Sequence, residues 1–329
     1  MPKPKLALYW AASCGGCEIA VVDIEEKILD VADFFDIVFW PVALDFKYED
    51  VEKMDDESIT LTLFNGSIRT EENEKIARLL RKKSKILVAF GSCACEGCIP
   101  GLANLYSKQS IFEYVYKESP SVTGDDKGIF PSEKTYLNGY EIEIPEFYDA
   151  VKTLDQVVEV DYYVPGCPPQ SFQIVNVIET VIDILKNNKP LPQKGTILGA
   201  GDKTCCDECP RTRKEKRIKS FYRIHEIIPR EDECLLDQGI LCMGPATRSG
   251  CGALCVKANV PCRGCYGAPP NVIDQGTKMI SALSSVIDAS SPEEARQIMS
   301  KIVDLVGTIY RFSLPASLLR KNHFADQMK

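Results

Sequence analysis

A cysteine-rich segment in the second half of the chain constrains the fold more than any other feature. Residues 205–265 hold nine of the 15 cysteines, with glycines and prolines interspersed among them. Such a segment can bury little aliphatic surface per residue, so something other than a large hydrophobic core must stabilise it. Disulfide bonds and bound metal are the two candidates.

The rest of the chain decides between these candidates. With 329 residues and 45% hydrophobic content, it can bury a substantial core and is expected to form two domains. The net charge of -8 argues against non-specific nucleic-acid binding. The pattern has no secretory signal and no apolar run of membrane-spanning length, which predicts a cytoplasmic protein without a membrane span. Cytoplasmic thiols stay reduced, and an odd cysteine count cannot be paired completely, so metal is favoured.

The first 190 residues are predicted to form a parallel α/β domain. Apolar stretches with strand character alternate with segments of helical periodicity, which is typical of a sheet flanked by helices. Strands are expected at residues 6–10, 36–40, 59–64, 85–90 and 157–164, and helices at 19–30, 71–83 and 171–186. Residues 106–150 are polar and weakly patterned, which indicates an insertion with short helices. A Pro-containing linker near residue 190 predicts a second domain over residues 191–329.

Three cysteine motifs follow predicted strands. Cys14-Gly-Gly-Cys17, Gly-Ser-Cys93 and Pro-Gly-Cys167-Pro-Pro each begin where a strand ends. Because the carboxyl ends of parallel strands share one edge of a sheet, these cysteines are expected to converge. Four thiolates are what a 4Fe–4S cluster takes, and a proline after a ligand cysteine recurs in cluster motifs. Alone, the Cys14/Cys17 pair also fits a thioredoxin-like redox motif.

Together, these three motifs resemble those of the small subunit of nickel–iron hydrogenases. The sequence is most similar to the cytoplasmic methanogen-type group. That group includes the methyl-viologen-reducing (non-deazaflavin-reducing) enzyme coupled to heterodisulfide reductase, and the deazaflavin-coenzyme-reducing enzyme. The resemblance covers nearly the whole chain. It implies a flavodoxin-like domain followed by an irregular, cysteine-rich iron–sulfur domain with C-terminal helices.

The resemblance also implies three 4Fe–4S clusters and their ligands. The proximal cluster would take Cys14, Cys17, Cys93 and Cys167. The medial cluster would take Cys251, Cys255, Cys262 and Cys265, and the distal cluster Cys206, Cys209, Cys234 and Cys242. Cys206 would replace the histidine that periplasmic members use first in the distal set.

The sequence departs from the family pattern at several positions. Gly97-Cys98 stands where the family usually has Gly-Gly, and Asn65 stands where it often has an acidic residue. The ligand count leaves over Cys95, Cys98 and Cys205, each of which is an alternative to an assigned ligand. Cys95 competes with Cys93, and Cys205 with its neighbour Cys206.

Two further features have a functional and a structural interpretation. Glu18 directly follows Cys17, and the resemblance implies a proton relay near this turn, although glutamate in the first turn of a helix is favoured by the dipole anyway. A basic run beside the predicted distal set is either a solvated helix face or a docking surface for an acidic electron-transfer partner. It consists of Arg211, Arg213, Lys214, Lys216, Arg217 and Lys219.

These observations predict an electron-transfer subunit of a hydrogenase, an oxidoreductase that acts on H2. The resemblance implies that hydrogen is split in a separate nickel–iron large subunit. Electrons would pass through the proximal, medial and distal clusters to an iron–sulfur adaptor subunit of heterodisulfide reductase. The alternative acceptor is a flavin subunit that reduces the deazaflavin coenzyme.

Two other classes remain open from the sequence. A complex I-like cluster subunit shares the flavodoxin-like domain, but that family has adjacent cysteines in its first motif and no multi-cluster C-terminal domain. A zinc-stabilised scaffold protein is the other, because Cys206-x-x-Cys209 and Cys262-x-x-Cys265 both have zinc-ligand spacing. Analysis for iron and zinc separates these classes.

Overall fold

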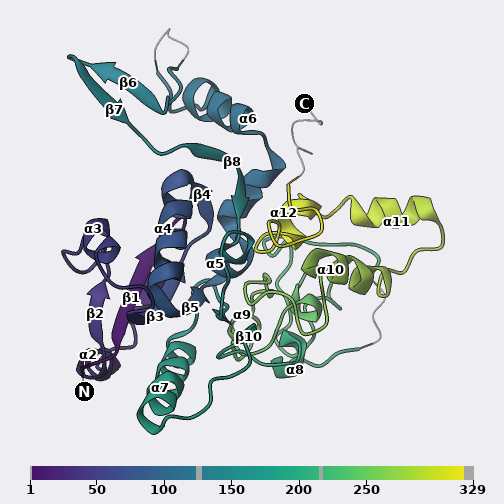
Figure 1. Cartoon of the computed structure of the whole chain (residues 1–329). Coiled ribbons are helices and arrows are strands. Elements are labelled where there is room, and N and C mark those ends of the chain that lie inside the picture. Colours follow the sequence, from purple (N-terminus) through teal and green to yellow (C-terminus); the bar gives the residue numbers. More distant parts are fainter. Residues whose placement is uncertain (1, 124–127, 215–217, 322–329) are drawn as a thin grey trace.

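The first part of the molecule is built on one parallel sheet. The computed structural model describes residues 2–123, 128–214 and 218–321 (Figure 1). The sheet has six strands in the order β10-β9-β5-β3-β1-β2, and every pairing in it is parallel. The strands are β1 (Lys5–Trp10), β2 (Asp36–Phe39), β3 (Ile59–Asn65), β5 (Ser84–Phe90), β9 (Tyr162–Val164) and β10 (Thr196–Ile197). Counted along the chain, the first five have the flavodoxin-like order 2-1-3-4-5, which confirms the predicted α/β class.

Helices cover both faces of this sheet. One face packs against α1 (Gly16–Val22), α2 (Lys27–Phe34) and α7 (Ser171–Asn187), with Leu6 and Leu8 of β1 in the shared core. The other face packs against α3 (Tyr48–Glu52), α4 (Glu71–Lys83) and α5 (Ser92–Glu96). Both sets of alternating side chains on β1 are therefore buried, as expected for a central parallel strand.

Helix α4 has the bounds that the sequence predicted, because both of its ends are encoded locally. The Thr70 side chain accepts a hydrogen bond from the backbone N–H of Asn73, and the Asn73 side chain reaches back in a capping box. Acidic side chains fill its first turn and basic ones its last, which complements the helix dipole.

Two predicted elements differ from the structure. The single helix expected over residues 19–30 is two helices, α1 and α2, because Glu25 adopts a φ of 58° between them. The strand expected over residues 157–164 is only the three-residue β9, preceded by the 3-10 turn Leu154–Gln156. The domain boundary near residue 190 stays a prediction. Strand β10, which follows that boundary in the sequence, pairs with the sheet of the first part.

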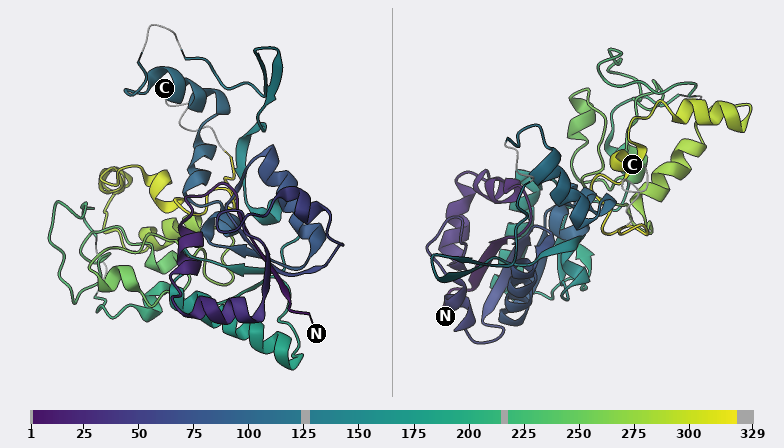
Figure 2. Two further views of the ribbon diagram at one scale, coloured as in Figure 1. Left: turned by 90° about the vertical axis from the view of Figure 1, so that its left-hand side faces the viewer. Right: turned by 90° about the horizontal axis from the view of Figure 1, so that it is seen from above.

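Residues 106–150 contain a projecting arm rather than short helices alone (Figures 1 and 2). The arm includes α6 (Lys108–Glu113), a short π-helix (Tyr114–Glu118) and an antiparallel hairpin of β6 (Lys134–Leu137) and β7 (Tyr140–Glu143). Every residue of the two hairpin strands is exposed. Strand β8 (Phe147–Lys152) returns to the sheet domain and pairs with β4 (Ile68–Thr70).

The second part is mostly irregular chain with short helices. These are α8 (Cys205–Glu208), α9 (Leu254–Lys257), α10 (Gln275–Ser284), α11 (Pro292–Met299) and α12 (Leu305–Ile309). A 3-10 turn lies at Gly244–Ala246, and another, Ile99–Leu105, belongs to the first part. An apolar cluster nevertheless forms here, because Met279 and Leu283 of α10 and Leu314 pack against buried cysteines. The C-terminal helices thus supply aliphatic surface that the cysteine-rich segment lacks.

The two parts meet at the carboxyl ends of the sheet strands (Figure 2). The Tyr266 hydroxyl donates to Gln173 Oε1 of α7 at 2.6 Å, and both residues are buried. The backbone N–H of Cys98 donates to Phe312 O at 3.0 Å. In the described ranges, no helix has the length and apolar character needed to cross a membrane.

Candidate functional site

The cysteines of the first part converge at the ends of β1, β5 and β9. Cys14 lies in the β1–α1 turn, Cys17 in the first turn of α1, Cys93 in α5 and Cys167 after β9. A Cβ on Gly91, at the end of β5, would lie 2.3 Å from Cys17 Sγ and 3.6 Å from Gly166 O. Burial raises the pKa of Cys17, and the neighbouring Cys167 and Cys14 thiols raise it further. Thiols from separate motifs therefore lie together at the carboxyl edge of the sheet, as the strand ends predicted.

Glycine at position 91 is required for this convergence. Its φ is 82°, a conformation that side chains rarely adopt, and any Cβ would occupy the space of the Cys17 thiol. The β5 motif can therefore approach the first cysteine pair only because residue 91 has no side chain.

The structure separates two of the three cysteines left over by the count. Cys98 lies among the N-terminal thiols: its Sγ is 3.6 Å from Cys167 Sγ, and it packs with Cys93 and Phe312. Cys95 turns the other way, into the core beneath α4, where its thiol donates to Ala89 O at 3.3 Å. Both lie in one short motif, so sequence reasoning could not tell them apart.

Glu18 is buried beside this group. Its carboxylate accepts hydrogen bonds from Trp40 Nε1 at 2.5 Å and from Asn65 Nδ2 at 3.4 Å. Burial raises the pKa of Glu18, whereas these two hydrogen bonds lower it. Trp40 was not singled out by the sequence, because its partner is 22 residues away and no local pattern links them.

One of the predicted medial cysteines, Cys265, lies next to the N-terminal thiols. Cys265 packs against the group that contains Cys93 and Cys98, and Ser92 Oγ donates to Cys265 O. Burial raises the pKa of Cys265, and Cys262 and Cys167 are the next contributors. Cys265 therefore faces both the N-terminal thiols and the medial set.

Cys205, the third leftover thiol, contacts the medial set. Its thiol forms hydrogen bonds with Cys251 and Cys262, and these raise its pKa. The same interaction lowers the pKa of Cys251 to about 6. Cys255 lies near Cys262 and Cys251, although burial is the larger cause of its raised pKa. Cys205 was predicted as an alternative to Cys206 in the distal set, whereas its hydrogen-bond partners belong to the medial one.

The predicted distal cysteines line one cavity. Cys206, Cys209, Cys234 and Cys242 surround it together with Cys205, Arg213 and aliphatic side chains. Burial raises the pKa of Cys206 to about 11, opposed by the Arg213 guanidinium. A Cβ on Gly244 would lie 2.9 Å from Cys206 Sγ, so this turn also approaches a thiol closely.

The donors in these three groups fit iron–sulfur clusters. The N-terminal and distal groups combine thiols from separated segments, and in both of them a glycine turn approaches a cysteine sulfur closely. The medial cysteines come from one segment, residues 251–265. Across residues 2–123, 128–214 and 218–321, no three His, Cys, Asp or Glu side chains are grouped closely enough to hold one metal ion. Which four thiols bind each cluster stays a prediction.

In its described part, the basic run is not a helix face, and its interpretation as a docking surface stays a prediction. Arg211 is buried, and its guanidinium donates to Val256 O, Glu233 O and Arg230 O, so it ties loops together. No helix forms there among the described residues. Lys214 pairs with Glu233, and Lys216 and Arg217 lie outside the described residues.

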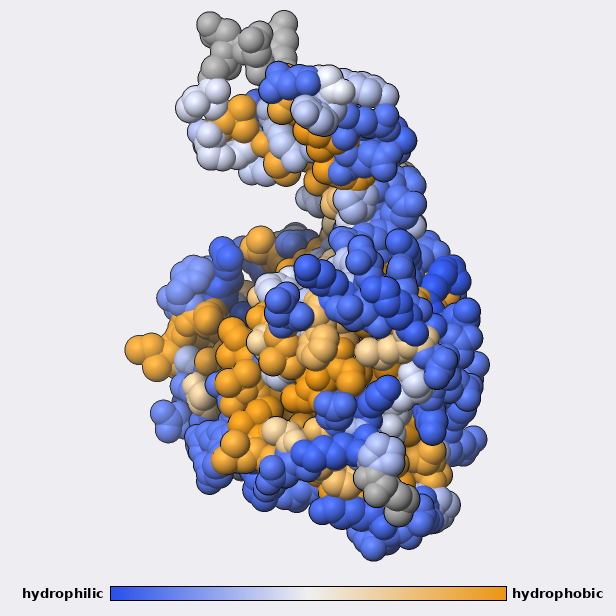
Figure 3. Space-filling model, turned by 60° about the vertical axis from the view of Figure 1, so that its left-hand side comes forward, coloured by the Kyte–Doolittle hydropathy of each residue, from blue (hydrophilic) through white to orange (hydrophobic). Residues whose placement is uncertain are grey.

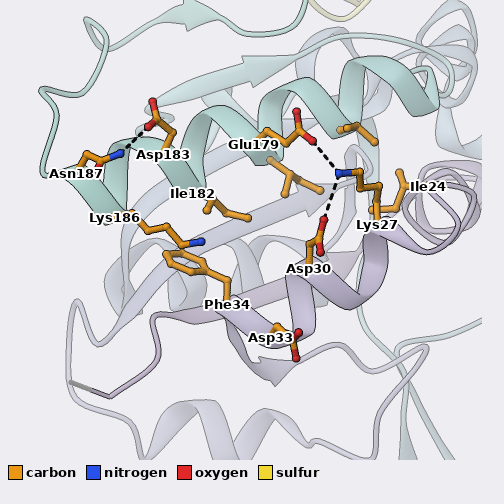
Figure 4. A pocket seen from close by; sticks show the side chains of 12 residues that line it. Ile24, Lys27, Asp30, Asp33, Phe34, Glu179, Ile182, Asp183, Lys186 and Asn187 are labelled. Carbon is orange, nitrogen blue, oxygen red and sulfur yellow. Dashed lines mark hydrogen bonds and ion pairs between the residues drawn. The ribbon is translucent and has the colours of Figure 1, made fainter.

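A separate open cavity lies between α2 and α7 (Figure 4). Lys27 Nζ bridges it, with bonds to Glu179 Oε1 at 3.1 Å and Asp30 Oδ2 at 3.3 Å. None of its lining residues is a cysteine. It is therefore distinct from the three thiol groups.

Comparison with known proteins assigns the class. The family described as NADH ubiquinone oxidoreductase, 20 Kd subunit, matches residues 14–181, which include all the N-terminal site cysteines. A [NiFeSe] hydrogenase chain from Desulfovibrio vulgaris Hildenborough has a similar fold, with a TM-score of 0.50 and 16% identity. The match covers 81% of this chain and 94% of that one. The fold is thus that of the small subunits of nickel–iron-type hydrogenases.

Relatives that match nearly the whole chain identify the family within this class of hydrogenase subunits. An F420-non-reducing hydrogenase iron–sulfur subunit from Archaeoglobus profundus is 43% identical over 97% of this chain and 99% of its own length. The corresponding F420-non-reducing hydrogenase subunit from Methanothermobacter marburgensis is 36% identical over 96% of each chain. The chain belongs to this family of F420-non-reducing hydrogenase subunits, and it is a subunit of an oxidoreductase.

Proposed function

We propose that this chain relays electrons from a nickel–iron site in a partner large subunit through three 4Fe–4S clusters. Cys14, Cys17, Cys93 and Cys167 would hold the proximal cluster. Cys251, Cys255, Cys262 and Cys265 would hold the medial cluster, and Cys206, Cys209, Cys234 and Cys242 the distal one. Bound 4Fe–4S clusters supply one-electron transfer.

The observation that carries this proposal is the serial arrangement of the thiol groups. The N-terminal group contacts Cys265, whose neighbour Cys262 contacts Cys205, and Cys205 in turn lines the distal cavity. A chain of adjacent sites suits stepwise electron transfer. Separate structural metal sites would need no such contact between groups.

The proposed partner at the start of the relay is the nickel–iron large subunit, where hydrogen would be split. Cys14 is exposed, so the proximal end reaches the surface of this chain. Exposed apolar side chains flank this turn, namely Trp10 at the end of β1 and Ile19 and Val22 on α1. A proximal cluster at such a surface suits electron entry from a docked subunit.

The proposed electron acceptor is an iron–sulfur adaptor subunit of heterodisulfide reductase in the cytoplasm. Its support is the full-length similarity to subunits named F420-non-reducing, which disfavours the alternative of a flavin subunit that reduces the deazaflavin coenzyme. Reconstituting the purified hydrogenase complex with each acceptor tests this choice. Hydrogen-dependent reduction of the deazaflavin coenzyme by the complex would contradict it.

Metal analysis of anaerobically purified complex tests the relay itself. Three cubane clusters predict about 12 irons and 12 sulfides for this chain, after the partner's iron is subtracted. Predominant zinc, or only about four irons, would overturn the three-cluster proposal.

A further inference from the structure

Cys98 occupies a central position among the N-terminal thiols, although four other cysteines already suffice for a cluster. Its side chain is 1% exposed. Its Sγ lies 3.6 Å from Cys167 Sγ and also in hydrogen-bond contact with Cys93. Cys98 is therefore a fifth thiol that touches two of the four proposed ligands.

The backbone around Cys98 is held by the C-terminal part of the chain. Its N–H donates to Phe312 O at 3.0 Å, and its φ is 49° with ψ at -151°. The preceding Gly97 has a φ of 90°, and a Cβ there would lie 2.2 Å from the Pro315 side chain. The Phe312–Pro315 loop therefore fixes the direction in which the Cys98 thiol points.

At 3.6 Å, the Cys98 and Cys167 sulfurs lie closer together than two ligands on different irons of one cubane cluster, so both could ligate that cluster only by moving apart. Each iron of a cubane takes one protein thiolate, so the four ligand sulfurs surround the cluster and do not touch one another. Cys167 follows a strand end and precedes Pro168, as a cluster ligand does. Cys98 is then left as a protonated thiol facing ligand thiolates, for which it is a hydrogen-bond donor.

We propose that Cys98 is a positioning residue whose S–H group donates a hydrogen bond to the Cys167 thiolate and raises the reduction potential of the proximal cluster. The inference rests on the proposed function. A donor to a ligand sulfur stabilises the extra negative charge that reduction brings, and hydrogen bonds to sulfur are among the main determinants of cluster potential. Cys98 thereby makes the proximal cluster a better electron acceptor.

The test compares three variants of the whole hydrogenase complex by EPR-monitored redox titration. Cys98→Gly removes the thiol and suits the positive φ, so it is expected to fold. Cys98→Ser keeps a hydroxyl donor at the same place. Cys95→Ala is the matched control, because it removes a buried thiol from the same motif without touching the N-terminal thiols.

With Cys98→Gly, one of the cluster midpoint potentials should become more negative while the iron content stays unchanged. Cys98→Ser should restore most of that shift, and Cys95→Ala should leave all potentials as in the wild type. A loss of about four irons in Cys98→Gly would instead make Cys98 a ligand and overturn the positioning role. Unchanged potentials would overturn it as well. Wild-type complex without iron would overturn the proposed function rather than this inference alone.

Discussion

At the scale of single residues, Glu96 is one of several described carboxylates with a buried oxygen that has no hydrogen-bond partner. Its Oε2 is buried without a hydrogen bond, as is Nε of the nearby Arg248. Burial raises the pKa of Glu96 to about 8; Arg248 opposes this shift and Asp155 adds to it. The folded protein therefore binds a proton at Glu96 that the unfolded chain releases near pH 4.5.

This difference predicts that Glu96 lowers stability as the pH rises. Between about pH 5 and 8 the folded state binds more protons than the unfolded state, so stability falls over that window. The wild type should lose roughly 2–3 kcal/mol of unfolding free energy between pH 6 and pH 9 that the Glu96→Gln variant keeps. Thermal unfolding of the two proteins at both pH values measures this. Parallel pH profiles would contradict the prediction.

Glu18 is predicted to carry protons, and its surroundings allow a clean test. Trp40 and Asn65 hold its carboxylate in one orientation, and Gln can still accept the Trp40 bond. A positioned acid–base group contributes about a hundredfold or more to proton transfer. In a hydrogenase complex that carries Glu18→Gln, the rate of exchange between H2 and deuterated water should fall about a hundredfold or more, while the iron content stays constant. If exchange is unaffected, Glu18 is only a structural residue.

At the scale of elements, local signals predicted most of the sheet domain. Helix α4 was predicted with its observed bounds, because Thr70 and the charges at both ends encode its limits. The break between α1 and α2 escaped prediction because Glu25 adopts a positive φ without a glycine or proline to signal it. The arm hairpin was also missed, since its strands bury no apolar face and so lack the alternation that indicates a half-buried strand.

The contact between α7 and the cysteine-rich part leads to a prediction about stability. Tyr266→Phe removes the 2.6 Å hydrogen bond to Gln173 Oε1, which keeps a weaker bond from the Gln170 N–H at 3.3 Å. The loss should be about 1 kcal/mol. That corresponds to a melting temperature lower by roughly 2–4 °C. Tyr140→Phe, on the exposed hairpin, is the control and should melt like the wild type; an equal effect of both variants would contradict the argument.

At the scale of the whole molecule, topology explains which parts of the candidate site could be predicted. The convergence of Cys14, Cys17, Cys93 and Cys167 follows from strand ends that share one edge, which the sequence pattern already indicates. The positions of Cys98 and Cys205 depend instead on contacts with Phe312 and Cys262, far along the chain. No local pattern encodes such contacts, so adjacent cysteines such as Cys205 and Cys206 could not be told apart.

The outer surface beside the proximal site is the place where the proposed large subunit would dock. Figure 3 shows a broad apolar area on one face of the molecule. Near Cys14 the exposed apolar side chains include Ile19 at 62% and Val22 at 57% exposure, both on α1. Apolar side chains that gather on a protein surface mark an interaction site.

A charge in this apolar surface should therefore weaken the hydrogenase complex. Val22→Glu is five residues from Cys17 and would bury an unpaired carboxylate on docking, a cost of about 3 kcal/mol or a roughly hundredfold weaker Kd. Co-purification with the large subunit and size-exclusion chromatography measure it. Ile129→Glu, at a position that is 90% exposed on the arm, is the matched control and should assemble normally. Equal assembly of both variants would place the large subunit on another surface, and loss of assembly in the control alone would place it on the arm.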